Sequence, residues 1–283
     1  MREIKVKAPA KINLTLEIIN KREDGFHNLK TIMHAISLYD ILAFRSYVSD
    51  SIVINLYGNS DEIPYNEKNL VYKAAMAFFT KANIKGAKLD VFIEKNIPLE
   101  AGMGGGSSDA AATLVALNEL YDKLLTDNEI DELAASIGSD INFCIKGGCA
   151  VCTSRGEVIN QIAPVELSVS IIKPKNFGVS TKEAYSKYGE LKDKTILNAT
   201  EKLSELIKNG KFDEKLLFNS FEKAYLNDYK ELYTVKNEVN ASMMTGSGSA
   251  FFVLRDKINS EIDLENYIIV ENLKTVADGV KII

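Results

Sequence analysis

The stretch from Pro98 to Ala112 carries the clearest chemical signal, since it reads P-L-E-A-G-M-G-G-G-S-S-D-A-A-A. Its four glycines lie within five residues, at Gly102, Gly104, Gly105 and Gly106. Glycines allow successive backbone N–H groups to converge on an anion, and a following helix adds unpaired N–H groups and the positive end of its dipole. The stretch predicts a phosphate-binding loop. The simpler alternative is a flexible turn capped by a serine.

The flanking segments favour the phosphate loop. Alternating apolar residues over Leu89–Ile93 predict a strand before it, and Ala110–Tyr121 is helical in pattern. We expect Ser107 or Ser108 at the helix N-cap and Asp109 in the first turn. The loop is not a Walker A motif because no Gly-Lys-Ser/Thr closes it, and its glycine spacing does not fit a dinucleotide-binding fingerprint.

Three other sites carry polar residues that could act on a phosphate or an alcohol. Lys11 and Asn13 share one face of an alternating, half-buried strand over residues 11–18. Phe26 and His27 follow an Asp-Gly turn signal, and Asp140 follows a helix that we expect to end at Gly138. Taken alone, these residues are as well explained by a solvated strand face, a surface turn and a helix cap.

The motifs taken together resemble the GHMP kinase family. The glycine stretch is similar to the family's phosphate loop, A-P-A-K-I-N-L (residues 8–14) to its N-terminal motif, and T-G-S-G-S (residues 245–249) to its third motif. G-S-D-I-N-F (residues 138–143) resembles the segment with the catalytic aspartate, and D-G-F-H (residues 24–27) a base-reading turn. These motifs occur in family order from Ala8 to Phe251.

The resemblance implies ATP and Mg²⁺ as cofactors and a division of roles in the site. Lys11 and Asp140 are the catalytic pair that it implies. The backbone of the glycine stretch would hold ATP, through Pro98, Gly102, Met103, Gly104, Gly105, Gly106, Ser107 and Ser108. A loop serine is a candidate ligand of Mg²⁺, although the sequence names no metal site.

The resemblance also implies a substrate that carries a cytosine. Phe26 would stack on the base, His27 would read its edge, and Tyr185 would cover its other face. For Tyr185, a core position on a helix is an equally good interpretation. The complete set of implied substrate contacts is Asn13, Phe26, His27, Thr181, Tyr185, Gly246, Ser247 and Gly248.

The implied reaction is ATP-dependent phosphorylation of the 2-hydroxyl of 4-diphosphocytidyl-2-C-methyl-D-erythritol, in non-mevalonate isoprenoid synthesis. Asp140 would accept the hydroxyl proton, and Lys11 would stabilise the carboxylate and the developing alkoxide. Two alternatives remain, namely another kinase of this fold acting on homoserine or mevalonate, and a non-catalytic sensor of small ligands.

Three features depart from the family's motifs or suggest other chemistry. Asn142 replaces the family's usual proline, and Ser154 replaces the first glycine of a G-R-G-E segment. Cys149 and Cys152 form a C-x-x-C, but they lie three apart on an expected strand and so face opposite sides. We therefore interpret both cysteines as structural, and we interpret His34 in the same way.

Composition sets the broad class. The chain has 283 residues, 46% of them hydrophobic and 26% charged, as in a globular protein. A net charge of −5 argues against nucleic acid or an anionic membrane as partner, and three cysteines favour a reducing cytoplasm. We expect a monomer or a weak homodimer.

The expected fold is the α+β, two-domain GHMP kinase architecture. A mixed-sheet nucleotide-binding domain would span residues 1–162, and an α+β, ferredoxin-like domain residues 163–283. We expect strands over residues 29–37, 41–44, 51–57, 148–153 and 166–173, with a last strand within 276–283. Asn69 and Thr126 are expected to cap helices, and further helices are expected over residues 197–209, 216–227 and 230–243.

Overall fold

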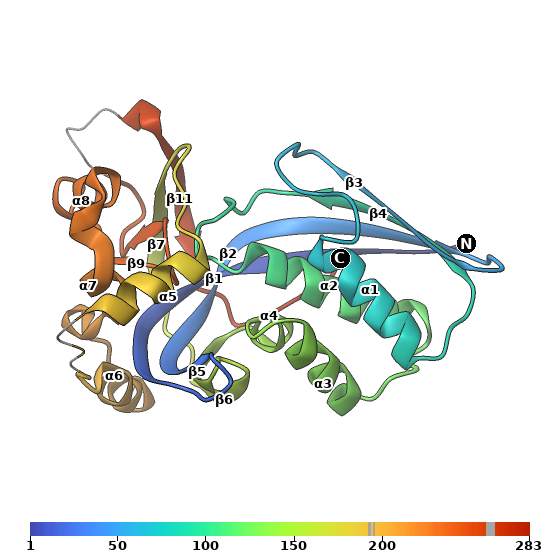
Figure 1. Ribbon diagram of the computed structural model, residues 1–283, viewed down its shortest axis with the longest axis horizontal. Coiled ribbons are helices and arrows are strands. Elements are labelled where there is room, and N and C mark those ends of the chain that lie inside the picture. The colour runs from blue at the N-terminus through green and yellow to red at the C-terminus, as the bar shows by residue number, and fades with distance from the viewer. Residues whose placement is uncertain (192–193, 195, 259–263) are drawn as a thin grey trace.

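A long antiparallel pair of strands, β1 (Arg2–Lys21) and β2 (His27–Tyr47), runs through the whole molecule (Figure 1). This computed structural model describes residues 1–191, 194, 196–258 and 264–283. The two short strands expected within residues 29–44 are one continuous strand, so the expected break is wrong. Asp40 sits in that supposed break, but it accepts backbone N–H bonds from Asn96 and Ile97, which satisfies its buried carboxylate.

The first half of the chain forms a mixed sheet covered by helices. β4 (Ala87–Glu94) pairs antiparallel with β2, and β3 (Ile52–Gly58) lies parallel to β4, connected by helix α1 (Leu70–Lys81). Helices α2 (Gly105–Leu120), α3 (Asp127–Ile137) and α4 (Ile141–Lys146) lie with α1 on one side of this sheet (Figure 1). Their apolar faces and the sheet enclose one buried core.

The expected helix caps are confirmed where they depend on local side chains. The Asn69 side chain accepts from the Val71 N–H at 2.9 Å, at the start of α1. Thr126 and Glu129 form a reciprocal capping box at the start of α3. Both motifs need only residues that are neighbours in sequence, which is why the pattern alone identifies them.

The start of α2 was predicted wrongly. The helix begins at Gly105 and not at Ala110, and its N-cap is Gly104, which has φ of 72° and therefore no capping side chain. Ser107 and Ser108 lie inside the helix, and Asp109 is beyond the first turn. Helix propensity argues against starting a helix with two glycines, but the left-handed turn at Gly104 sets the helix start here.

The second half is built on another sheet, in the order β11 (Tyr267–Lys274), β7 (Ser168–Pro174), β10 (Phe251–Val253) and β9 (Met243–Met244). Its helices are α5 (Thr181–Glu190), α6 (Ala199–Lys208), α7 (Ser220–Tyr225) and α8 (Lys230–Asn237). Short 3₁₀ turns cover Glu214–Leu216, Leu226–Asp228 and Leu264–Asn266. The molecule is therefore α+β with a mixed sheet, as expected.

Two expected helices of this half are shorter than predicted. The helix expected over residues 216–227 begins only at Ser220, because Phe218–Asn219 forms strand β8, parallel to β1. The helix expected over residues 230–243 ends at Asn237, and Met243 already belongs to β9. In both cases tertiary strand pairing takes residues that a helical pattern includes.

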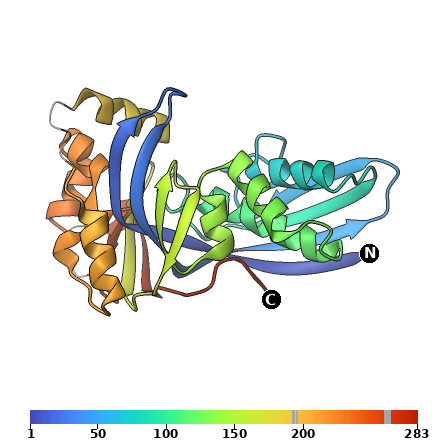
Figure 2. The ribbon, with the colours of Figure 1, turned by 90° about the horizontal axis from the view of Figure 1, so that it is seen from below.

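The polar face of β1 is buried, contrary to the half-buried strand expected. Lys11, Asn13, Thr15 and Glu17 are all nearly inaccessible to solvent. The second half of the chain covers them: the Thr15 and Thr200 hydroxyls lie 2.9 Å apart, and the Glu17 carboxylate accepts the first N–H groups of α6. Figure 2 shows the far end of β1 and β2 curving toward this half.

The expected domain boundary at residues 162 and 163 falls in the connection between β6 (Val158–Ile162) and β7, and it stays a proposal. Strands cross this division, because β8 and the terminal strand β12 (Lys281–Ile282) both pair with β1. None of the helices within the described ranges combines the length and the apolar composition needed to cross a bilayer.

The C-x-x-C pair lies on β5 (Cys149–Ser154), and both thiols are free and buried. Cys149 and Cys152 pack into different clusters of the core, as strand alternation predicts. Burial raises the pKa of each thiol to about 12. His34 is also buried, and its Nε2 accepts from the Val165 N–H, which confirms a structural role.

Candidate active site

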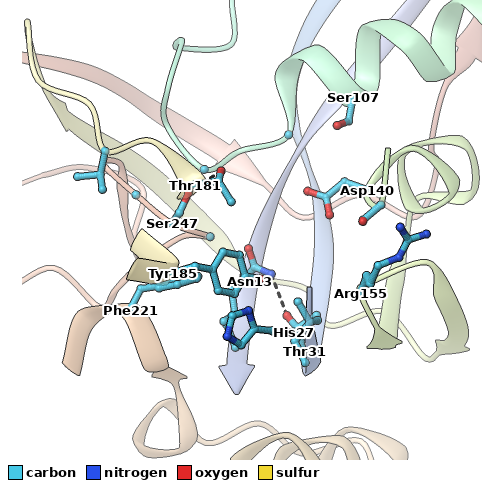
Figure 3. Close-up of a pocket in the computed structure, with 18 of the residues that line it drawn as sticks. Asn13, His27, Thr31, Ser107, Asp140, Arg155, Thr181, Tyr185, Phe221 and Ser247 are labelled. Atoms are coloured by element: carbon cyan, nitrogen blue, oxygen red, sulfur yellow. Dashed lines mark hydrogen bonds between the residues drawn. The ribbon is translucent and has the colours of Figure 1, made fainter. Parts of the chain in front are cut away.

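A cavity of about 790 Å³ lies where the glycine loop, the middle of β1 and β2, the start of α5 and the turn at residues 246–248 meet (Figure 3). It brings together most of the side chains that the motifs single out, namely Lys11, Asn13, Phe26, His27, Gly102, Gly104, Ser107, Asp140, Thr181, Tyr185, Gly246, Ser247 and Gly248. The remaining candidates, Pro98, Met103, Gly105, Gly106 and Ser108, do not line it.

Lys11 and Asp140 face each other in this cavity. The Lys11 Nζ lies 3.7 Å from Asp140 Oδ2 and donates a hydrogen bond of 2.7 Å to Asn13 Oδ1. Only 5% of the Lys11 side chain is exposed, against 29% for Asp140. Asp140 caps α4 without a side-chain hydrogen bond, so its carboxylate is available to a ligand. The pair can accept a proton from an alcohol and stabilise the oxyanion that forms.

Asn13 is held by contacts on two sides. Its Nδ2 donates to the Thr31 hydroxyl at 2.8 Å, the bond that is dashed in Figure 3. Its backbone N–H donates to the Thr245 hydroxyl at 3.1 Å. Since Asn13 Oδ1 in turn accepts from Lys11, this chain of bonds fixes the ammonium of Lys11 in one position.

The N-terminus of α2 points toward the Lys11 and Asp140 pair. A Cβ added at Gly104 would lie 3.2 Å from Lys11 Cγ and 3.9 Å from Asp140 Oδ2, so only glycine leaves this approach open. The first N–H groups of a helix have no partner within it and favour an anion. The Ser107 hydroxyl also lines the cavity, whereas Ser108 donates its hydroxyl to the Pro9 carbonyl at 2.8 Å.

Aromatic rings form the opposite end of the cavity. The His27 and Tyr185 rings are stacked, with centroids 4.6 Å apart and planes 12° from parallel, and Phe221 meets the edge of Tyr185 (Figure 3). Phe26 lies on the rim and is 54% exposed. Burial, with Lys21 and Lys194 nearby, holds the pKa of His27 below its usual value, which keeps the imidazole neutral at pH 7.

The turn at residues 245–249 packs directly on the glycine loop. Ser249 and Ala250 donate backbone hydrogen bonds to Glu100 and Ala101. A Cβ at Gly102 would lie 2.1 Å from the Thr245 carbonyl oxygen, and one at Gly246 would lie 2.7 Å from the Gly102 carbonyl oxygen. The glycines at these two positions let the loops touch, so the second half of the chain closes the site.

Several residues of the site were not identified by the motifs. Thr31, Glu100, Ser139, Arg155, Lys182 and Phe221 also line the cavity. Among these, Thr31 lies on the strand paired with β1, where a threonine carries no distinctive pattern. Arg155 directly follows Ser154, which replaces a glycine of the family's motif. That replacement was the one feature of the sequence that drew attention to this turn.

The two departures from the family's motifs have structural explanations. Ser154 adopts φ of 63°, the left-handed region that favours glycine, and its hydroxyl donates to Glu157 Oε1 at 3.0 Å. Asn142 lies in the first turn of α4 and donates to the Asp131 carbonyl at 2.9 Å. Neither change disturbs Asp140, which stays in the cavity.

A buried cluster of three charged side chains packs against the start of α2, next to the glycine loop. Lys95 Nζ contacts the carboxylates of Asp40 and Asp109, and a Cβ at Gly105 would lie 3.2 Å from this Nζ. Asp109 Oδ1 is buried and has no hydrogen-bond partner among the described residues. Burial of two carboxylates with one ammonium raises the pKa of Asp109 to about 8.

Comparison with known proteins identifies the fold and the family. Residues 69–152, which contain the glycine loop, match the family described as GHMP kinases N terminal domain. A crystal structure of homoserine kinase from Cytophaga hutchinsonii has the same fold, with a TM-score of 0.75 over 100% of this chain and 98% of that one, at 20% identity. The fold is that of the GHMP kinases.

Relatives with a higher sequence identity identify a more specific family. A 4-diphosphocytidyl-2-C-methyl-D-erythritol kinase of Clostridium botulinum (strain Alaska E43 / Type E3) is 39% identical over 253 residues, which cover 87% of this chain and 89% of that protein. A crystal structure of 4-(cytidine 5'-diphospho)-2C-methyl-D-erythritol kinase matches with a TM-score of 0.69 and 31% identity, over 89% and 90% of the two chains. This chain belongs to the 4-diphosphocytidyl-2-C-methyl-D-erythritol kinase family.

Proposed function

We propose that this protein transfers the γ-phosphate of ATP to the 2-hydroxyl of 4-diphosphocytidyl-2-C-methyl-D-erythritol, in non-mevalonate isoprenoid synthesis. The observation that carries the proposal is the Lys11 and Asp140 pair, which faces the N-terminus of α2 in a cavity with aromatic rings at its other end. Relatives of that name, similar over most of the chain, support the same substrate.

ATP would bind with its phosphates at the glycine loop. The free N–H groups at the start of α2 and the glycine backbone would hold the phosphate oxygens. Mg²⁺ would offset the phosphate charge during transfer. The Ser107 hydroxyl and the Asp140 carboxylate line the cavity as oxygen donors, which fits an ion that takes few protein ligands besides phosphates and water.

The alcohol would lie between the loop and Asp140. The Asp140 carboxylate accepts the proton of the 2-hydroxyl as the oxygen attacks phosphorus, and the Lys11 ammonium stabilises the developing negative charge on that oxygen. Lys11 is held in place for this by Asn13, so little reorganisation is needed when charge develops. Most of the remaining catalysis is positioning.

The cytosine would be bound at the aromatic end. Phe26 and Tyr185 offer flat surfaces for stacking, and the neutral His27 has one nitrogen that donates and one that accepts a hydrogen bond. The His27 and Tyr185 rings stack on each other, so both belong to one aromatic surface at this end of the cavity. We also propose a cytoplasmic location, since a chain with three cysteines favours a reducing compartment.

The test is ADP release from ATP and Mg²⁺ with the cytidylyl substrate, and with homoserine and mevalonate in parallel reactions. We expect turnover with the cytidylyl substrate and none with homoserine or mevalonate. Turnover with only homoserine or mevalonate would keep the phosphate loop and reject the base-reading roles. Binding of ATP without any turnover would favour the alternative of a non-catalytic sensor.

A further inference from the structure

The turn between β5 and β6, residues 154–157, is partly buried and is held by hydrogen bonds within the turn. Ser154 donates its hydroxyl to Glu157 Oε1, and the Arg155 N–H donates to Glu157 Oε2 at 2.8 Å. These two bonds hold Ser154 in the left-handed conformation and fix the direction in which Arg155 leaves the turn.

A second turn is tied to this one. Arg22 donates to the Ser154 hydroxyl at 3.0 Å and to the Asn28 side chain at 3.1 Å, and it is paired with Asp24. Arg22 and Asp24 belong to the turn between β1 and β2, which carries Phe26. The position of Arg155 relative to the Phe26 ring is therefore fixed by contacts on both sides.

The guanidinium of Arg155 lies between the two ends of the cavity. Its central carbon is 5.2 Å from the centroid of the Phe26 ring, at the base-binding end. The next residue, Gly156, borders the catalytic end, since an added Cβ would lie 3.7 Å from Asp140 Oδ1. Figure 3 shows Arg155 beside Asp140 at the edge of the cavity.

Arg155 also keeps unused hydrogen-bonding capacity. Its Nε is 3.6 Å from the Glu157 carboxylate, which is too long for a hydrogen bond. Within the described part of the chain, neither Nη group forms a hydrogen bond. By contrast, the Nζ of Lys11 is already engaged by Asn13 and Asp140.

We propose that Arg155 binds the diphosphate of the nucleotide substrate and so helps to select a cytidine diphosphate compound. This inference rests on the proposed function. In such a substrate the diphosphate joins the nucleoside to the reacting alcohol, so it must pass between Phe26 and Asp140. A guanidinium presents a planar fork of donors that matches phosphate oxygens, and it stays charged.

The test measures binding of cytidine and of CDP to the wild type and to Arg155→Gln, by calorimetry with the ATP site filled by a non-hydrolysable ATP analogue. The variant should bind CDP about 10- to 100-fold more weakly, as expected for lost hydrogen bonds to a charged group. Its affinity for cytidine should stay within about twofold. In turnover, KM for the cytidylyl substrate should rise while kcat changes little.

Three further variants separate direct contact from an effect on the turn. Arg22→Gln removes a guanidinium that holds the same turns but does not line the cavity, and it should leave the ratio of CDP to cytidine affinity unchanged. Arg155→Lys keeps the charge without the fork and should recover part of the CDP affinity. Lys182→Gln tests Lys182, an exposed cation that also lines the cavity.

The outcomes that overturn the proposal are distinct. Equal losses for cytidine and CDP would mean that Arg155 acts only on the Phe26 ring. A selective CDP loss in Lys182→Gln, with Arg155→Gln unaffected, would assign the diphosphate to Lys182. A wild-type protein that binds neither ligand would reject the proposed function itself, and with it this role of Arg155.

Discussion

Asp140 and Lys11 approach each other without a direct hydrogen bond, at 3.7 Å, and the arrangement leaves the carboxylate open to an incoming alcohol. Lys11 is positioned by Asn13, and Asn13 by Thr31 and Thr245. The catalytic contact therefore depends on four separate segments of the chain, which carry Lys11 and Asn13, Thr31, Asp140 and Thr245.

Asp140→Asn should lower kcat by about 10²- to 10⁴-fold, because the amide cannot accept the hydroxyl proton. The melting temperature should change little, since the Asp140 side chain is partly exposed and makes no capping bond. Steady-state ADP release and thermal unfolding measure the two effects. Asp131→Asn is a matched control on α3, outside the cavity. Near wild-type turnover in Asp140→Asn would remove Asp140 from the mechanism.

His27 gives a prediction for pH. Its pKa lies below the usual value of about 6.5, because burial and nearby lysines disfavour the charged ring. The lowered pKa favours the neutral form at pH 7, and cytidine affinity should fall as the pH is lowered through the pKa of His27, because the ring then loses its acceptor nitrogen.

Calorimetric titration of cytidine between pH 5 and 8 checks this, with His27→Gln as the control that should bind weakly and without the low-pH fall. The other histidine, His34, should not contribute to the fall in affinity over this pH range, since burial lowers its pKa to about 4. A fall of equal size in His27→Gln would assign the titration to another group.

At the scale of elements, a buried ion cluster ties helix α2 to the neighbouring sheet. Lys95 at the end of β4 joins Asp40 on β2 to Asp109 on α2, and all three side chains are buried. Two carboxylates around one ammonium leave an uncompensated negative charge, which a proton on Asp109 would remove. The cluster fixes the helix start at the phosphate loop, at a cost in stability that depends on pH.

Asp109→Asn should gain stability relative to the wild type as pH rises. The folded pKa of Asp109 is raised from 3.8 to about 8, so the folded wild type holds a proton that the unfolded chain releases. The contribution of Asp109 to the free energy of unfolding of the wild type is complete below pH 3.8 and is lost as the pH rises toward 8. Asparagine does not titrate, so the variant shows no such loss.

Urea unfolding at pH 5, 6.5 and 8 measures the difference. Lys95→Met is the contrasting variant, because it leaves two buried carboxylates without their cation and should cost about 3–5 kcal/mol at pH 8. If the difference between Asp109→Asn and wild type did not vary with pH, Asp109 would not be the titrating group.

At the scale of the whole molecule, the two halves are joined across the polar face of β1. The Glu17 carboxylate accepts from the backbone N–H groups of Ala199 and Thr200 at 3.1 and 3.0 Å. It takes the place of a local cap, because Asn198 at the N-cap of α6 makes no side-chain capping bond. A strand of the first half thus stabilises a helix of the second.

Glu17→Ala should lower the free energy of unfolding by about 1–3 kcal/mol, since two buried N–H groups lose their acceptor. Glu17→Gln, which keeps one acceptor oxygen, should lose less. Glu23→Ala changes an exposed turn residue and serves as the control. Urea unfolding followed by circular dichroism gives the values. An unchanged midpoint in Glu17→Ala would show that α6 does not need this cap.

Features that depend on neighbours in sequence were predictable from the chain itself. The caps at Asn69 and Thr126 and the opposite orientations of Cys149 and Cys152 need only local geometry. The glycine loop and its motifs identified the family because close backbone approach allows few residue types, as the space around Gly102 and Gly104 shows. The family and the α+β class follow from these short segments.

Only the tertiary structure decided which polar residues are buried and what they contact. The alternation of β1 predicts two faces, but the second half of the chain covers the polar one, so its side chains become ligands of distant groups rather than of water. The ion cluster at Lys95 and the position of Arg155 beside Phe26 have no local pattern, because their partners are far away in sequence. A sequence specifies periodicity within a few residues, whereas burial and charge pairing arise when remote segments pack together.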